Sequence, residues 1–199
     1  MGSSAHRAGI TLFIGAVQFV IFLVAAEAYY PGYSVSANYI SDLGATCGLG
    51  TCSVQPLASA IFGVSVSLLG ILTLLTGYFL WKGSFPKLGS LAVVMTGIGA
   101  LGVGLFPETT GAVHGIFSLI AFLFAGVAAI ALSRVQKRPL NYFSAILGAA
   151  TLVSLALYVG NVYLGLGPGG MERMVVYPVL LWGIGFGGHL IGTEDKKAT

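Results

Sequence analysis

The stretch Val113–Leu132, VHGIFSLIAFLFAGVAAIAL, contains no Asp, Glu, Lys or Arg, and its only titratable side chain is that of His114. A helix of about 20 apolar residues is long enough to cross the hydrocarbon core of a bilayer, which is about 30 Å thick. In water, such a helix would expose apolar side chains on every face. The stretch therefore predicts a transmembrane helix.

Five further runs of similar length and character lie on either side of this stretch, separated by charges, prolines or glycine clusters. The predicted spans are residues 10–30, 57–81, 88–106, 113–132, 142–164 and 174–191. Residues 31–56 form a long first loop and the other connections are short, so consecutive helices are expected to be antiparallel neighbours. The sequence predicts an all-α protein, a polytopic transmembrane bundle of about six helices in a single domain over residues 1–199.

The composition agrees with a lipid environment. Hydrophobic residues make up 56% of the chain, charged residues only 8%, and the mean hydropathy is +0.94, whereas about a quarter of the residues in soluble domains are charged. Most of the 30 glycines lie inside apolar runs, where small residues let helices approach closely. Gly97 and Gly104 share one predicted helix face, and Gly183 and Gly187 are four residues apart. The net charge is only +3 without a large basic cluster, which excludes nucleic acid as a partner.

The orientation follows from the Lys and Arg residues, because cytoplasmic loops carry an excess of both. With six spans and both ends in the cytosol, eight of the nine basic residues fall on the cytosolic side and only Arg173 lies outside. We therefore expect a multi-pass protein of the cell membrane with cytoplasmic amino and carboxyl ends. The long first loop and the polar residues near it then face outward.

A cleaved signal peptide is the alternative for the first apolar run. Arg7, the apolar run and the small residues around Glu27 resemble such a signal, and cleavage would leave five helices. The run is long for a signal peptide, however, and Glu27, Tyr29 and Tyr30 are typical of a helix end at the membrane interface. We expect the first helix to remain.

Cys47 and Cys52 are the only cysteines, and they lie in one short glycine-rich segment of the first loop. In an oxidising compartment they could close a small disulfide loop. An external loop favours that disulfide, while a reduced pair remains the alternative.

Polar residues that are rare in this chain gather at the predicted outer face. The candidate outer-face site comprises Asp42, Glu108, His114, Arg173, Glu27 and Asn38. A partly dry cleft with several titratable groups could bind a polar head group or a cation, or could support hydrolysis. The alternative is that these side chains are hydrated at the membrane interface and have no further role.

Two short segments define this candidate site more closely. In residues 38–44, NYISDLG, Ser41 and Asp42 can cap a turn and Gly44 can adopt a left-handed conformation. In residues 106–115, FPETTGAVHG, Glu108 and His114 lie at opposite ends of one short loop. These two side chains could meet as a hydrogen-bonded pair, as metal ligands, or as a general acid and base.

Glu172 and Arg173 directly precede the last predicted helix. A carboxylate at that position is favoured by the positive end of the helix dipole, so helix capping accounts for Glu172. Arg173 is the only basic residue predicted outside, and either a lipid phosphate or a salt bridge to Glu27, Asp42 or Glu108 would satisfy it. We favour the salt bridge.

Established catalytic and metal-binding patterns are missing from the sequence. It contains no Gly-x-Ser-x-Gly, His-Glu-x-x-His or phosphate-binding loop. His114 and His189 lie at opposite membrane faces and therefore cannot bind one haem. We predict no metal site and identify no cofactor or catalytic residue, and whether the protein is an enzyme stays open.

The two segments resemble a known family. The helix count, the long outer loop with residues 40–44, ISDLG, and the element of residues 106–115 are similar to the archaeal and bacterial six-helix membrane proteins filed under domain of unknown function nine hundred ninety-eight. The resemblance covers most of the chain and implies the fold and an outer site, but no activity. More distantly, the architecture resembles the eukaryotic group of autophagy-modulating and glycolipid-anchor-remodelling membrane proteins, which hints at lipid handling.

Three functions are compatible with these features. The first is binding or modification of membrane lipid head groups at the outer face. The second is a structural role, in which glycine-rich helix faces dock a membrane-protein partner or a second copy of the chain. The third is a small transporter, which the scarcity of polar residues at mid-membrane disfavours.

Overall fold

The computed structural model describes residues 4–48 and 50–195, and six long helices dominate them. They are α1 (Ser4–Ala28), α2 (Pro56–Lys82), α3 (Lys87–Leu105), α4 (Ala112–Ser133), α5 (Leu140–Val159) and α6 (Gly167–Asp195). Each of the six is long and apolar enough to cross a membrane. The predicted all-α bundle of six transmembrane helices is confirmed.

Three helices differ from the predicted spans by five residues or more at one end: α1 begins at Ser4, not at residue 10, and α5 and α6 also have different bounds. α6 begins at Gly167, not at residue 174, because Gly167 adopts a φ of 77° and Pro168 follows it. Proline is favoured in the first turn, where its missing N–H would have no partner within the helix. α5 ends at Val159, not at residue 164, and Asn161 and Leu164 beyond it have positive φ angles of 58° and 50°.

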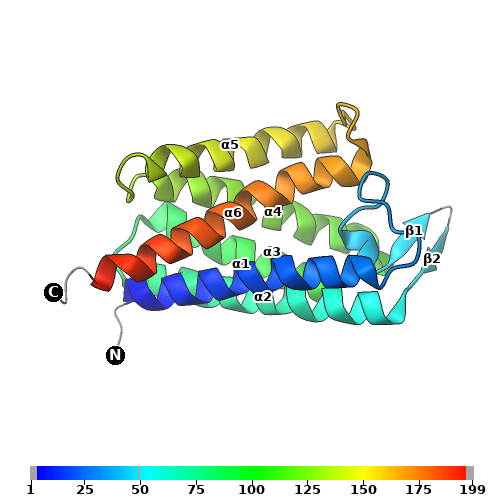
Figure 1. The fold of residues 1–199 in the computed structure, drawn as a ribbon, viewed down its shortest axis with the longest axis horizontal. Coiled ribbons are helices and arrows are strands. Elements are labelled where there is room, and N and C mark those ends of the chain that lie inside the picture. The colour runs from blue at the N-terminus through cyan, green and yellow to red at the C-terminus, as the bar shows by residue number, and fades with distance from the viewer. Residues whose placement is uncertain (1–3, 49, 196–199) are drawn as a thin grey trace.

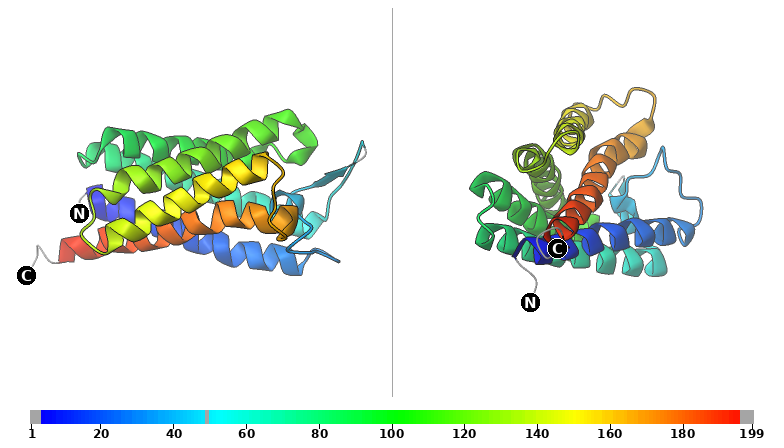
Figure 2. Two further views of the ribbon diagram at one scale, coloured as in Figure 1. Left: turned by 90° about the horizontal axis from the view of Figure 1, so that it is seen from above. Right: turned by 60° about the vertical axis from the view of Figure 1, so that its left-hand side comes forward.

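The helices form a closed ring in chain order. Each helix packs against the next one, and α6 returns to pack against α1. Both ends of the chain therefore lie at one end of the bundle, as Figures 1 and 2 show.

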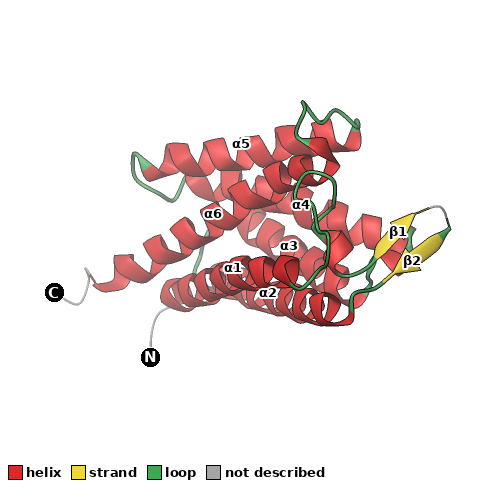
Figure 3. Ribbon diagram, turned by 45° about the vertical axis from the view of Figure 1, so that its right-hand side comes forward, coloured by secondary structure: helices red, strands yellow, loops and turns green. Residues whose placement is uncertain are grey.

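The first loop occupies the other end of the bundle. It contains a short 3-10 helix, η1 (Ser41–Leu43), and a hairpin of β1 (Thr46–Gly48) and β2 (Thr51–Ser53). Figure 3 shows this hairpin projecting beyond the helices. A second 3-10 helix, η2 (Glu108–Thr110), connects α3 and α4 and contacts β1. We call this end of the molecule the hairpin end.

Large apolar side chains lie both inside the bundle and on its surface. Phe19, Phe62 and Leu43 form part of a buried cluster that extends to the hairpin end, and Trp182 and Phe186 belong to a second cluster nearer the chain ends. Outside, Val64 remains 70% exposed. Such a surface is stable in contact with lipid and unstable in water.

Glycines permit the close contacts between helices. A Cβ atom at Gly70 would lie 2.4 Å from the backbone nitrogen of Leu101 on α3. Gly97 and Gly104 both face α2, and Gly187 faces the backbone of α1. The predicted role of these glycines in helix packing is confirmed, whereas Gly188 faces open space.

We expect Gly70→Ala to lower the thermal unfolding temperature of the protein in detergent, at a cost of about 1–3 kcal/mol, because the new methyl group collides with the α3 backbone. Gly185→Ala is the matched control, since a Cβ at Gly185 meets open space and alanine is the better helix former. Equal unfolding temperatures for the two variants would contradict this account of the α2–α3 contact.

Candidate functional site

The first loop is shaped by its own polar side chains. The Asp42 carboxylate accepts hydrogen bonds from the Asn38 side-chain amide and from the Tyr39 backbone N–H, both at 2.9 Å. Asn38 Oδ1 in turn accepts from the Ser34 N–H at 3.0 Å. Asp42 therefore stabilises a turn, as the sequence predicted, and its side chain is buried within the loop.

Gly44 does not adopt the predicted left-handed conformation. Its φ is −76°, in the right-handed region, so backbone freedom does not explain the glycine. A Cβ atom there would lie 3.2 Å from the Phe62 ring of α2. Close packing of the loop on α2 is the physical reason for a small residue at this position.

Arg173 joins the first loop to two helices. Its Nη2 atom donates to the Glu27 carboxylate of α1 at 2.6 Å and to the Tyr33 hydroxyl at 2.7 Å. Its Nη1 atom donates to the backbone oxygens of Val35, Asn38 and Gly169 at 3.0–3.2 Å. The favoured salt bridge is present, with Glu27 as the partner. Both terminal nitrogens of this buried guanidinium are thus engaged within the protein.

Glu172 does not cap the helix start as expected from the sequence. It lies in the second turn of α6, beyond the start at Gly167, and is only 4% exposed. Its carboxylate accepts a hydrogen bond from the backbone N–H of Ile40 in the first loop. Gly169, one turn earlier, donates its N–H to the backbone oxygen of Ser36 at 2.9 Å. The start of α6 is therefore the surface on which the first loop docks.

Glu108 bonds to the same loop from the opposite side. The Ser41 hydroxyl donates to the Glu108 carboxylate. Burial raises the pKa of Glu108 and the charge of Asp42 raises it further, while the Ser41 hydroxyl, His114 and the Cys47 backbone N–H lower it. The net result is a carboxyl group with a pKa above that of an ordinary glutamate.

His114 lies in the first turn of α4 and is 8% exposed. Its Nδ1 atom is 2.8 Å from the backbone oxygen of Phe106. Since a carbonyl oxygen can only accept, Nδ1 donates to it, and Nε2 takes no part in this bond.

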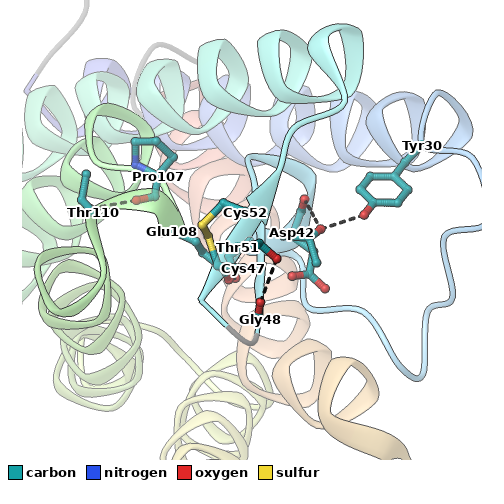
Figure 4. The surroundings of a disulfide bond; sticks show 11 residues. Tyr30, Asp42, Cys47, Gly48, Thr51, Cys52, Pro107, Glu108 and Thr110 are labelled. Atoms are coloured by element: carbon teal, nitrogen blue, oxygen red, sulfur yellow. Dashed lines mark hydrogen bonds between the residues drawn. A yellow bond between two sulfur atoms is a disulfide. The ribbon is translucent and has the colours of Figure 1, made fainter.

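The disulfide predicted for the first loop is present. Cys47 and Cys52 are bonded and stand directly opposite each other in the hairpin. Figure 4 shows Glu108 next to this disulfide, with Asp42 and Tyr30 on the other side. The Tyr30 hydroxyl is 2.7 Å from that of Thr46 on β1, so the hairpin is anchored beside the candidate site.

A cavity of about 340 Å³ opens among these elements, and we call it the hairpin-end cavity. Its lining combines polar groups from the first loop and from η2, α4, α5 and α6 with an apolar wall from α4 and α5. The lining residues are Tyr39, Ser41, Glu108, His114, Gly115, Ser118, Leu119, Phe122, Leu155, Tyr158, Val159 and Glu172.

The six candidate residues thus separate into two groups. Glu108 and His114 line the hairpin-end cavity. Glu27, Asn38, Asp42 and Arg173 lie beside it, where their hydrogen bonds hold the first loop on α1 and α6.

Several lining residues lie outside the candidate site that the sequence indicated. Tyr158 of α5 packs edge-on against Tyr39, with ring centroids 5.9 Å apart. Burial, with a contribution from Tyr163, raises the pKa of Tyr39 to about 12, so its phenol stays neutral. Ser118 follows His114 by one helical turn, and this spacing could have identified it. Tyr158 follows Ser154 and Thr151 of α5 by one and two helical turns, so the same kind of spacing applies to it.

Within residues 4–48 and 50–195, no group of three or more His, Cys, Asp or Glu side chains is arranged to hold a metal ion.

Arg173→Met should destabilise the protein far more than Glu27→Gln. The first change leaves the Glu27 carboxylate and two loop carbonyls without their donor, at a cost of about 3 kcal/mol, whereas a glutamine at position 27 can still accept from Arg173. Thermal unfolding in detergent measures both, with the exposed Arg134→Met as control. A larger loss for Glu27→Gln would contradict the central role of Arg173.

We expect the stability advantage of Glu108→Gln over the wild type to grow with pH. A carboxyl group whose pKa rises on folding binds its proton more tightly in the folded chain. The wild type therefore loses stability as the pH rises from the ordinary glutamate range through the raised pKa, and glutamine has no such loss. Thermal unfolding from about pH 4 to about pH 8 tests this. A difference that is constant or shrinks with pH would refute it.

Comparison with known proteins identifies the family. The family model described as "Protein of unknown function (DUF998)" matches residues 13–189, and the match includes both segments on which the resemblance was based. No curated protein and no solved structure matches the chain. The more distant eukaryotic resemblance stays a prediction. Because the match covers most of the sequence, the chain belongs to the DUF998 family.

Proposed function

We propose that this protein binds the polar head group of a membrane lipid in the hairpin-end cavity. The observation that carries the proposal is the composition of this cavity of about 340 Å³, in which Glu108, His114 and Tyr158 face an apolar wall that includes Leu119 and Phe122. It lies at the end of helices long enough to cross a bilayer, at the depth where lipid head groups meet water. A ligand that is polar on one side and apolar on the other fits this environment.

The charge of the lining favours a particular class of head group. The cavity contains the carboxyl groups of Glu108 and Glu172, and no Lys or Arg is among its described lining residues. The nearby Arg173 already donates through both terminal nitrogens to protein oxygens. An exposed phosphate monoester would find no cation here. An ammonium or a hydroxyl group would find acceptors, so we propose a head group that donates hydrogen bonds, such as ethanolamine.

We further propose that the hairpin end faces the outside of the cell. Arg7, Lys82, Lys87 and Arg134 lie at the opposite ends of their helices, which is the arrangement expected of a cytoplasmic face. Among the described residues, Arg173 is the one Lys or Arg near the hairpin end, and it is paired with Glu27. The disulfide of the hairpin also supports an oxidising compartment.

A membrane-protein partner or a homo-oligomer stays a prediction. Gly97, Gly104 and Gly187, on the helix faces that suggested docking, contact other helices of the same chain. Gly188 and Gly192 face open space and remain available for such a contact. The cavity favours lipid binding over this alternative.

Native mass spectrometry of the purified protein with equal amounts of phosphatidylethanolamine and phosphatidic acid tests the proposal. The wild type should retain phosphatidylethanolamine preferentially. Glu108→Gln removes the charge but keeps an acceptor for Ser41, and it should lower the preference about tenfold, as expected for the loss of one charge-assisted hydrogen bond. His114→Gln should weaken retention of the lipid.

Thr109→Ala serves as the control, because Thr109 is exposed in the same turn as Glu108. This variant should behave as the wild type. Equal retention of the two lipids by the wild type, or an unchanged preference in Glu108→Gln, would overturn the proposed head-group site.

A further inference from the structure

A second cavity lies inside the helix bundle. It has a volume of about 110 Å³, and side chains from α1, α2, α3, α4 and α6 line it. Most of them are apolar, as illustrated by Phe19, Phe62, Val93, Ala125 and Val176. We call it the interior cavity.

The interior cavity adjoins the hairpin-end cavity. Four residues line both, namely Ser41, Ser118, Phe122 and Glu172. From this shared boundary the interior cavity extends away from the hairpin end, past Ala125 to Ala128 on α4 and past Val176 to Gly183 on α6. A polar compartment at the end of the bundle therefore continues into an apolar one within it.

The depth of the interior cavity corresponds to one leaflet of a membrane. Its lining on α6 runs from Glu172 to Gly183, which at 1.5 Å per residue is about 16 Å. Half of a hydrocarbon core of about 30 Å is about 15 Å. A space this deep with a volume of only about 110 Å³ is slender, so two hydrocarbon chains cannot lie in it side by side.

The deep end of the cavity is mostly apolar. Leu12, Val93, Ala128 and Trp182 lie there, and the polar groups at this depth include the Thr73 hydroxyl and the buried indole N–H of Trp182, which has no hydrogen-bond partner within the described part of the chain. A buried water needs about two to four polar partners. An empty space, on the other hand, forfeits the dispersion contacts of its lining. A hydrocarbon chain restores those contacts without requiring polar partners.

We propose that the interior cavity receives a single hydrocarbon chain of the lipid whose head group occupies the hairpin-end cavity. This inference rests on the proposed function and narrows the ligand to an amphiphile that inserts one chain into the bundle. The head group contacts Glu108 and His114, the chain passes Ser41 and Phe122, and its end lies near Trp182.

Photolabelling tests the position of the chain. The probe is lysophosphatidylethanolamine with a diazirine at the end of its one acyl chain, added to the full-length protein in lipid nanodiscs. We expect the probe to label residues at the deep end of the interior cavity, namely Leu12, Val93, Ala128 and Trp182. An excess of lysophosphatidylethanolamine without the diazirine should abolish this labelling.

Ala125→Leu adds bulk in the middle of the interior cavity and should reduce deep-end labelling at least severalfold. Ala149→Leu is the matched control on the exposed surface of α5 and should leave labelling unchanged. Thermal unfolding of each variant establishes that it is folded. The labelling map of the wild type tests the proposal independently of either variant.

The outcomes separate the two proposals. Displaceable labelling that depends on Glu108 but maps to lipid-facing residues such as Ile14 and Leu75 would overturn the interior site and leave the head-group site standing. Undiminished deep-end labelling in a folded Ala125→Leu variant would also overturn the interior site. A wild type that shows no displaceable labelling at any residue would overturn both.

Discussion

The hairpin end of this protein depends on one buried cation. Arg173 donates to Glu27 on α1 and to Tyr33 and two backbone oxygens of the first loop, so a single guanidinium connects the first helix, the last helix and the segment between α1 and α2. A buried charge is tolerated when it is paired and hydrogen-bonded, as both terminal nitrogens of Arg173 are, while its Nε has no hydrogen-bond partner among the described residues. The loop must therefore adopt the path that brings its carbonyl oxygens to Arg173. That path in turn carries Ser41 to Glu108 and Ile40 to Glu172.

The polar residues at the hairpin end have two different roles: some hold the first loop in place and others line the hairpin-end cavity. One group forms hydrogen bonds within the protein and thereby fixes the first loop; it comprises Glu27, Asn38, Asp42 and Arg173. Glu108 accepts hydrogen bonds from Ser41 and from the Cys47 backbone N–H, His114 bonds to Phe106, and both residues line the cavity. A cluster of charged residues at a membrane interface can thus be mainly structural, with only part of it available to a ligand.

The sequence was sufficient to predict the fold, because six apolar runs leave few other arrangements in a bilayer. It also indicated the Cys47–Cys52 disulfide, since both cysteines lie in one short loop, and the pairing of Arg173 with one of three carboxylates. It failed for Gly44 and Glu172, whose roles depend on contacts with distant segments. Glu172 meets Ile40 across 132 positions of the chain, and no local pattern encodes such a contact.

The residues that line the two cavities could not be predicted in full from the sequence either. Stretches that are apolar on every face have no periodicity that reveals which side turns inward, so Phe19 and Ala125 could not be assigned to an inner surface. Ser118 is an exception, because it lies one turn from His114. The contacts between neighbouring helices in the ring determine which residues line the cavities. Glycines such as Gly70 and Gly99 allow these contacts, because each lies close to the backbone of the next helix.

The closure of the ring by α1 and α6 has a consequence for biosynthesis. Glu27 and Arg173 are 146 positions apart, and chains are made from the amino end at about 5–20 residues per second. While α2 to α5 are being inserted, Glu27 has no guanidinium to pair with and must remain hydrated at the membrane surface. The docking surface for the first loop exists only once the final helix has been delivered. The hairpin end is therefore the last part of the molecule to be completed, and a chain that ends before α6 has no completed site.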